Sequence, residues 1–305
     1  MGKKFSSASQ IMSRFRGWIQ AGAALLTNLH LPNFLKGKLY QGAGKTVCVP
    51  GLNCYSCPAA SGACPIGAFQ AVVGSSKFSF SYYITGFLIL LGVLLGRFIC
   101  GFLCPFGWFQ ELLHKIPTKK FSTKKLKPLR YLKYAVLLVM VFLLPAFLVN
   151  DVGMGDPFFC KYLCPQGVLE GAIPLSLANS GIRSALGSLF TWKFGVLLAV
   201  IVLSVIFYRP FCKWLCPLGA FYALFNRVSL FQIKVDKSKC VSCGKCAKAC
   251  KMDVDVTKAP NHTECIRCGM CIRTCPTGAV RFRYGFGDGK DKTKAAKKAA
   301  ENNKQ

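Results

Sequence analysis

Acidic residues and histidines are scarce in this chain. Its 305 residues include 40 Lys and Arg but only 11 Asp and Glu, and there are just three His. At most one of His30, His114 and His262 falls where it could face the interior of an apolar run, so a membrane haem held by two histidines is excluded. The sequence also lacks a Gly-x-Gly-x-x-Gly fingerprint and a Walker loop. We therefore expect neither haem nor a bound nucleotide.

The surplus of bases occurs in an apolar chain. Hydrophobic residues make up 52% of the sequence, and the mean hydropathy is +0.38. A net charge of +29 also occurs in proteins that bind nucleic acid through a basic face. Here the bases flank long apolar runs, which is typical of multispanning membrane proteins. We expect contact with membrane lipids and no nucleic-acid partner.

Four apolar runs have about the length that crosses a bilayer. They cover residues 16–31, 82–99, 131–149 and 191–208, close to the roughly 20 residues of a transmembrane helix. The first run is the least apolar, and an interfacial helix or a signal peptide is its alternative. Residues 115–130, between the second and third runs, carry seven bases and no acid, which indicates a cytoplasmic loop. Four spans then place both termini in the cytoplasm and the loops 31–81 and 150–190 outside.

Eighteen cysteines form short clusters, and five of them begin the pattern Cys-Pro-x-Gly. These are Cys64, Cys104, Cys164, Cys216 and Cys275. Pro at the first helical position lets a helix begin directly behind the cysteine, and the helix N-terminus then faces an anionic group at the thiolate. Five such copies, each following a cysteine, indicate iron–sulfur clusters.

The last cysteines have the spacing of a bacterial two-cluster ferredoxin. Two runs read C-x2-C-x2-C-x3-C, and in such proteins three cysteines of one run and the fourth of the other hold each [4Fe–4S] cluster. This predicts ferredoxin site 1 from Cys240, Cys243, Cys246 and Cys275, and ferredoxin site 2 from Cys250, Cys265, Cys268 and Cys271. Structural zinc and disulfides are the alternatives, and they fit interlocked triplets on the cytoplasmic side less well.

Two earlier segments look like copies of one unit. Arg97-x-x-Cys100-x3-Cys104-Pro-x-Gly matches Arg209-x-x-Cys212-x3-Cys216-Pro-x-Gly, and both follow an apolar run. Two such pairs suffice for one membrane cluster at the inner face, with Cys100, Cys104, Cys212 and Cys216 as ligands.

Six further cysteines are expected on the outward side: Cys48, Cys54, Cys57, Cys64, Cys160 and Cys164. Four of them would hold an outer cluster, and our first choice draws on Cys54, Cys57 or Cys64 together with Cys160 and Cys164. Disulfides are the alternative at an oxidising face, and the sequence does not select the four. One or two clusters are thus expected in the membrane domain, beside the two in the ferredoxin domain.

These observations predict a mainly α fold with about four transmembrane helices in two parallel pseudo-repeats. A small C-terminal α+β domain of the 2[4Fe–4S] ferredoxin type follows. The predicted boundaries are 1–231 for the membrane domain, 232–288 for the ferredoxin-like domain, and 289–305 for a basic disordered tail.

Residues 48–70, with RFICGFLCPFG and RPFCKWLCPLG, resemble the membrane polyferredoxins of the NapH, NosR and YccM type. The resemblance implies a bacterial cytoplasmic (inner) membrane location with the ferredoxin domain in the cytoplasm. It also implies electron transfer between a quinone or a soluble ferredoxin and a redox partner protein such as a flavoprotein. The chain would be an electron carrier or a quinol dehydrogenase-type subunit.

Two other functions compete with electron transfer. The first is an iron–sulfur redox sensor or an assembly or maturation factor. The second is a subunit of an ion-motive redox complex, which ranks last because the spans carry essentially no carboxylates. A relay also requires the inner and outer sites to approach each other, because a hydrocarbon core of roughly 30 Å is long for one electron hop. Glu111 and His114 are expected on the polar face of an interfacial helix rather than at a quinone.

Overall fold

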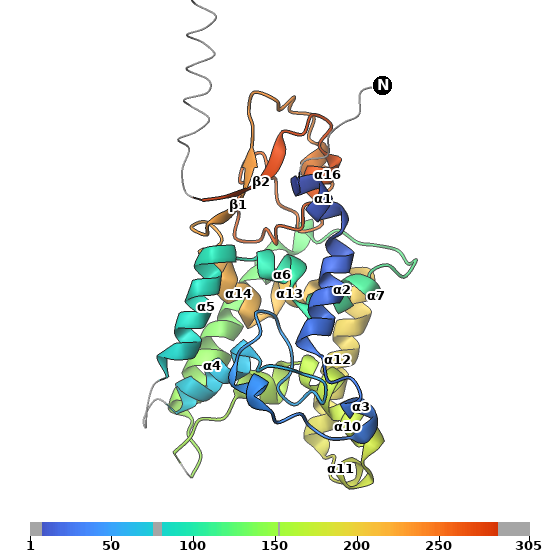
Figure 1. The fold of residues 1–305 in the computed structure, drawn as a ribbon, viewed down its shortest axis with the longest axis vertical. Helices are drawn as coiled ribbons and strands as arrows, with labels where there is room; N and C mark the ends of the chain where they lie inside the picture. The colour runs from blue at the N-terminus through green and yellow to red at the C-terminus, as the bar shows by residue number, and fades with distance from the viewer. Residues whose placement is uncertain (1–7, 76–80, 152, 286–305) are drawn as a thin grey trace, which may run out of the picture.

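The computed structural model describes residues 8–75, 81–151 and 153–285, and helices dominate them. The predicted basic tail 289–305 and the last three residues of the predicted domain 232–288 lie outside this range. A body of helices carries a small domain with two strands at one end of the molecule (Figure 1).

The first part of the body holds the N-terminal helices and the first of the two matching cysteine units. Its helices are α1 (Ala8–Arg14), α2 (Arg16–Thr27), α3 (Asn33–Lys36), η1 (Ala43–Thr46), α4 (Pro65–Gly74), α5 (Tyr82–Leu95), α6 (Phe98–Phe102) and α7 (Pro105–Leu113). The cysteine unit lies on α6 and α7. Helix α5 ends at Leu95, and the next residue, Gly96, has a positive φ of 54° that glycine adopts readily.

The second part of the body repeats the order of a long apolar helix followed by two short helices. Its elements are η2 (Lys124–Tyr131), α8 (Leu132–Val136), η3 (Leu137–Leu143), α9 (Leu144–Phe147), η4 (Phe159–Leu163), η5 (Gly167–Ala172), α10 (Ile173–Ala178), α11 (Ser180–Ser184), α12 (Ser188–Ile206), α13 (Pro210–Trp214) and α14 (Pro217–Phe225). The second cysteine unit lies on α13 and α14, as the first lies on α6 and α7.

Two helices among the described residues are long and apolar enough to cross a membrane. They are Leu126–Phe147, which runs through η2 to α9, and Ser188–Ile206, which is α12. They correspond to the predicted third and fourth spans. The predicted second span forms the shorter α5, and the first forms the 12-residue α2. The four-span topology therefore stays a prediction.

The outer surface of the body is apolar. Helices α5, η3 and α12 expose large hydrophobic side chains, among them Leu90, Leu138 and Val202. In water such a surface would be costly, whereas hydrocarbon tails accept it. This surface and the two long helices fit a membrane protein.

The C-terminal domain is built around two antiparallel strands. Strand β1 (Phe231–Val235) pairs with β2 (Val280–Tyr284), with Phe231 opposite Tyr284. Between them lie the short helices α15 (Lys245–Lys248) and α16 (Met270–Thr274). Helix α1 packs on α16 and β2, as the blue and orange-red ribbons at that end show (Figure 1).

The helix starts predicted behind Cys-Pro-x-Gly are confirmed for four of the five copies. Cys64, Cys104 and Cys216 are the N-cap residues of α4, α7 and α14, each with Pro at the first turn. A helix also follows Cys164. The prediction is wrong at Cys275, where a turn leads directly into β2, because the strand that pairs with β1 begins only five residues later.

Candidate iron–sulfur centres

The eight cysteines of the C-terminal domain gather into two groups of four. Those of ferredoxin site 1, Cys240, Cys243, Cys246 and Cys275, line one cavity, and those of ferredoxin site 2, Cys250, Cys265, Cys268 and Cys271, line another. Each group joins three cysteines of one run to one of the other, which is the crossed arrangement that the spacing predicts. Cluster ligation by each group stays a prediction.

The backbone of both runs is wound tightly around these cavities. Ser242 and Arg267 occupy equivalent places and have φ values of 51° and 52°, and the equivalent Gly244 and Gly269 have 69° and 77°. A residue other than glycine pays about 1–3 kcal/mol for such a conformation. Left-handed turns of this kind direct successive backbone N–H groups into a concavity that binds anions. The loops are therefore shaped for an anionic cluster with sulfide corners.

The inner site comprises Cys100, Cys104, Cys212 and Cys216, which come from both matching units. All four are buried. Burial first, and then the neighbouring thiols of Cys212 and Cys100, raise the pKa of Cys216. The N–H of Gly219 donates to the Cys216 sulfur at 3.3 Å. The structure thus brings together the four cysteines that the sequence assigns to one cluster.

A reciprocal pair of arginines joins the two units. Arg97 donates to the carbonyl oxygen of Cys212 at 3.4 Å, and Arg209 donates to the carbonyl oxygen of Cys100. Both side chains are fully buried. The glycine of the Cys-Pro-x-Gly pattern makes room for this crossing, since a Cβ on Gly107 would lie 2.8 Å from Nη1 of Arg209.

The inner site offers an unused donor to an anion. Nη2 of Arg209 is buried and has no hydrogen-bond partner, although an unsatisfied buried donor costs about 1–3 kcal/mol. Cys212 and Cys104 are among the charges around this guanidinium. The donor set of four thiols and a buried guanidinium fits a [4Fe–4S] cluster, which is anionic with its thiolates.

Among the six outer cysteines, we propose Cys54, Cys64, Cys160 and Cys164 as the ligands of the outer site. These four line a cavity of about 650 Å³ together with Cys48. Burial raises the pKa of Cys54 most, followed by the neighbouring thiols of Cys164 and Cys64. The same three causes, in the same order, raise the pKa of Cys160.

The two remaining outer cysteines differ in where they lie. Cys57 does not line the cavity and instead points its sulfur at Oδ1 of Asn28, 3.6 Å away. Cys48 lines the cavity on the side of Cys64. Burial raises the pKa of Cys48 most, and Cys64 is the one thiol that raises it further. All eighteen cysteines are free thiols in the structure. No three His, Cys, Asp or Glu side chains among the described residues could hold a single metal ion.

One loop touches both the inner and the outer site. The backbone N–H of Leu52 faces Cys104 and lowers the pKa of its thiol, and the N–H of the next residue, Asn53, faces Cys64 and lowers the pKa of that thiol. A Cβ on Gly51 would lie only 2.8 Å from the Cα of Cys104. The two sites are therefore separated by the width of a single loop.

Ferredoxin site 2 lies against the inner site in the same way. The residue after Cys100 is Gly101, and a Cβ there would come within 2.2 Å of the carbonyl oxygen of Ile266. Ile266 sits between Cys265 and Cys268. The backbones of the two sites are thus in direct contact, and a side chain at position 101 would force them apart.

Buried ion pairs hold the C-terminal domain on the body. Glu264 is bonded to Arg97 at 3.0 Å and to Lys133 at 2.6 Å, with all three side chains at most 4% exposed. Asp253 likewise meets Lys213 and Arg130, each at 3.3 Å. Burial raises the pKa of Glu264, but Arg97 and Lys133 lower it by more, so the net shift is downward and the carboxylate stays ionised.

Glu111 belongs to another buried ion cluster rather than to an exposed polar face. It is bonded to Arg16, to Arg209 and to the hydroxyl of Tyr208. Burial raises the pKa of Glu111, but Arg209 and Arg16 bring it down to about 2. The polar face expected for this helix is therefore occupied by ion pairs at Glu111, and its place at a membrane interface stays a prediction. His114 packs its ring edge-on against Tyr208.

Sequence reasoning missed a set of residues six positions after the membrane-domain Cys-Pro-x-Gly cysteines: Gln70, Gln110, Glu170 and Tyr222. Glu170 is half-buried and accepts a hydrogen bond from the backbone N–H of Cys54 at 3.1 Å. Burial raises the pKa of Glu170 to about 7. The equal spacing from four cysteines was a signal that could have identified these positions.

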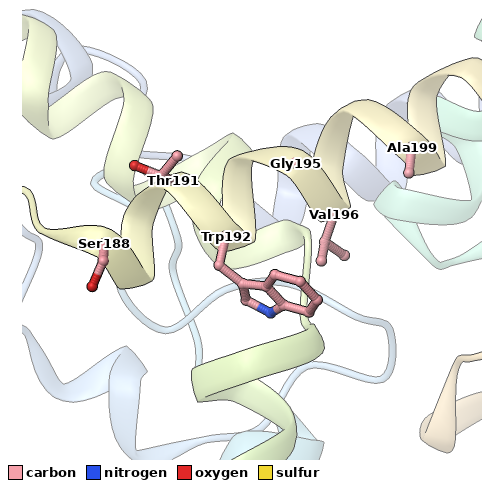
Figure 2. Close-up of a pocket in the computed structure, with 6 residues that line it drawn as sticks. All are labelled: Ser188, Thr191, Trp192, Gly195, Val196 and Ala199. Atoms are coloured by element: carbon pink, nitrogen blue, oxygen red, sulfur yellow. The ribbon is translucent and has the colours of Figure 1, made fainter.

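A broad depression of about 710 Å³ lies away from the cysteines. Its lining residues are Ser188, Thr191, Trp192, Gly195, Val196 and Ala199. Figure 2 shows that all of them project from the single helix α12, with the indole of Trp192 at the centre. No cysteine or charged group lines it, so we assign it no part in the metal centres.

Comparison with known proteins identifies the class. The 4Fe-4S binding domain family matches residues 62–82, 79–124, 133–173 and 189–238, about half of the chain, and a second 4Fe-4S binding domain family matches 233–254 and 259–281. Each of the first four segments contains one Cys-Pro-x-Gly. The chain belongs to this iron–sulfur family. More narrowly, it is a ferredoxin-type electron transport protein, a polyferredoxin of the NapH, NosR and YccM type.

Three relatives illustrate this membership. An uncharacterized protein of Methanocaldococcus jannaschii is 32% identical over 209 residues, which cover 65% of this chain and 77% of the relative. YccM of Escherichia coli, named for electron transport, is 28% identical over 56% of this chain and 45% of its own. The methylamine utilization ferredoxin-type protein MauN of Paracoccus denitrificans is 27% identical over 61% and 56%. No solved structure matches the chain.

Replacing Glu264 tests the anchoring of the C-terminal domain. Glu264→Gln leaves Arg97 and Lys133 buried without a counter-charge, and breaking a buried pair in this way costs about 3–5 kcal/mol. We expect the free energy of unfolding to fall by about this amount, measured by denaturant titration of the purified protein. Asp156→Asn removes the half-exposed partner of Lys161 and should change stability little. Equal effects of the two variants would contradict the assigned role of Glu264.

Proposed function

We propose that this protein is a membrane-bound relay that passes single electrons between the cytoplasm and a quinone or an extracytoplasmic redox partner. It would do so through four [4Fe–4S] clusters, held by ferredoxin sites 1 and 2, the inner site and the outer site. A bound cluster supplies one-electron transfer at a potential that its protein surroundings set. The residues of this chain supply the ligands, the spacing and the exclusion of water.

The observation that carries the proposal is the contact from site to site. Leu52 and Asn53, which are adjacent in the chain, face one cysteine of the inner site and one of the outer site with their backbone N–H groups, and Gly51 packs on the backbone of Cys104. Gly101 and Ile266 bring the inner site against ferredoxin site 2. The two ferredoxin sites share one small domain, in which α15 contacts α16. This continuity supports a route in which no single hop crosses the whole bilayer core.

The charge distribution supports a cytoplasmic position for the ferredoxin domain. Arg130, at the end of the basic loop 115–130, is paired with Asp253 of that domain, and Thr123 of the loop is bonded to the same carboxylate. The most basic loop and the ferredoxin domain therefore lie at one end of the molecule. Basic loops are retained in the cytoplasm, so we propose that this end faces inward and the outer site outward, in a bacterial cytoplasmic membrane.

The buried arginines fit this role. The cationic side chains of Arg97 and Arg209 lie beside four thiolate ligands, and the pKa of Cys212, which burial raises, is lowered first by Arg209 and later by Arg97. Both guanidinium groups are fixed by further partners, Glu264 and Glu111 respectively. They balance negative charge at the inner site without moving, and this keeps the reorganisation that accompanies each electron small.

Counting metal in a matched pair of variants tests the four-cluster assignment. Protein purified without air should contain about 16 iron ions per chain, four for each cube. Cys54→Ser should lower the count by about four and remove one paramagnetic resonance signal. Cys57→Ser is the control and should keep all the iron, because Cys57 does not line the outer cavity. Loss of the outer signal in the Cys57 variant alone would contradict the assignment.

Removing the inner site tests the relay itself. In the Cys212→Ser variant, a reduced soluble ferredoxin should still reduce the clusters of the ferredoxin domain, but the outer cluster should remain oxidised because the intermediate site is gone. Freeze-quenched paramagnetic resonance follows each cluster separately. Reduction of the outer cluster at the unaltered rate would overturn the proposed order. Clusters that exchange electrons with neither ferredoxin nor quinone in the unaltered protein would favour a sensor.

A further inference from the structure

Two buried glutamines reach across the body to cysteine sulfur. The heptapeptide Cys-Pro-x-Gly-x-Phe-Gln occurs at 64–70 and again at 104–110. Gln70, on α4, donates from Nε2 to Sγ of Cys160 at 3.2 Å, and Gln110, on α7, donates to Sγ of Cys212 at 3.1 Å. Both glutamines are fully buried. Each contacts the first cysteine of the CxxxCP unit that completes its site.

The orientation of each amide is fixed by its other partners. The backbone N–H of Phe159 donates to Oε1 of Gln70 at 3.0 Å, and that of Phe211 donates to Oε1 of Gln110 at 3.2 Å. An N–H donor requires an oxygen opposite it, so in both cases the NH₂ group must face the sulfur. The second amide hydrogen bonds to the carbonyl four residues earlier, at 3.3 Å from Gln70 and 3.4 Å from Gln110.

The other two residues that follow a Cys-Pro-x-Gly cysteine by six positions make different hydrogen bonds. Glu170 accepts from the N–H of Cys54, and Tyr222 donates to the carbonyl of Pro50 at 3.0 Å. Neither of these bonds supplies a donor to sulfur. Each of the two membrane sites therefore receives one side-chain amide donor. At the outer site it comes from Gln70 to Cys160, and at the inner site from Gln110 to Cys212. Packing alone would not require the same donor at both sites.

We propose that Gln70 and Gln110 are positioning residues that set the reduction potentials of the outer and inner clusters. Reduction adds negative charge that is shared with the cysteine sulfurs, and a fixed N–H donor stabilises the sulfur that carries this charge. The donors therefore raise the potential of the site that each one touches. This inference rests on the proposed function, because it requires clusters at both sites.

The test is a redox titration of the full-length protein followed by paramagnetic resonance. Gln70→Met keeps the length of the side chain and removes the donor, so the potential of the outer cluster should become more negative while the other three clusters keep theirs. Gln110→Met should shift the inner cluster alone. Each variant is thus the control of the other. Tyr222→Phe, at the equivalent position without a bond to sulfur, should leave the ferredoxin clusters unchanged and shift the inner and outer potentials less than either glutamine variant.

A second substitution separates tuning from packing. Gln70→Glu and Gln110→Glu retain an oxygen for the N–H of Phe159 or Phe211, and they place negative charge beside the sulfur, so the same cluster should shift in the same negative direction. Full iron content with unchanged potentials in both variants of a glutamine would overturn this inference and leave the proposed relay intact. An unaltered protein with iron for only the two ferredoxin clusters would overturn both.

Discussion

Two buried guanidinium groups hold the two matching cysteine units together. Each is bonded across the body to the backbone of a cysteine in the opposite unit. Burying an ion costs several kcal/mol unless it is paired, and here each arginine has a carboxylate partner, Glu264 for Arg97 and Glu111 for Arg209. Glu264 directly precedes a cysteine of the ferredoxin domain. The ion pairs that satisfy the arginines therefore also fix where that domain sits, and the inner site and its neighbour cannot shift independently.

The proposed route for electrons depends on loops more than on helices. The long helices Leu126–Phe147 and Ser188–Ile206 give the protein its apolar surface. The contacts between sites come instead from the loop at 51–53, from Gly101 in the short helix α6, and from the irregular backbone at Ile266. Irregular backbone at membrane depth is tolerated only where protein or a cavity covers it. The short helices α4, α6, α7, α13 and α14 provide that cover. Cysteines lie at the N-terminal ends of α4, α7 and α14 and in the middle of α6 and α13.

The sequence predicted the chemistry better than the architecture. Cysteine spacing is a local property and predicted which cysteines gather in the ferredoxin domain, and the two matching units predicted the four that gather at the inner site. Cluster ligation at these sites stays a prediction. The cysteines of the outer site could not be predicted in this way, because choosing Cys54 over Cys57 depends on which sulfur faces η4 and η5, about a hundred residues later in the chain. The same holds for Glu111, whose apparent polar face is covered by α2 and Arg209. Apolar runs predicted spans of similar length, but Gly96 ends α5 early.

The order of the cysteines along the chain has a consequence for biogenesis. Every proposed site takes ligands from distant segments, and the last ligand of each appears in a fixed sequence: Cys164 for the outer site, Cys216 for the inner site, and Cys271 and Cys275 for the ferredoxin domain. A nascent chain leaving the ribosome therefore completes its outermost set of thiols first. In the proposed orientation, maturation would proceed from the outer site toward the translating ribosome, with the ferredoxin domain finished last.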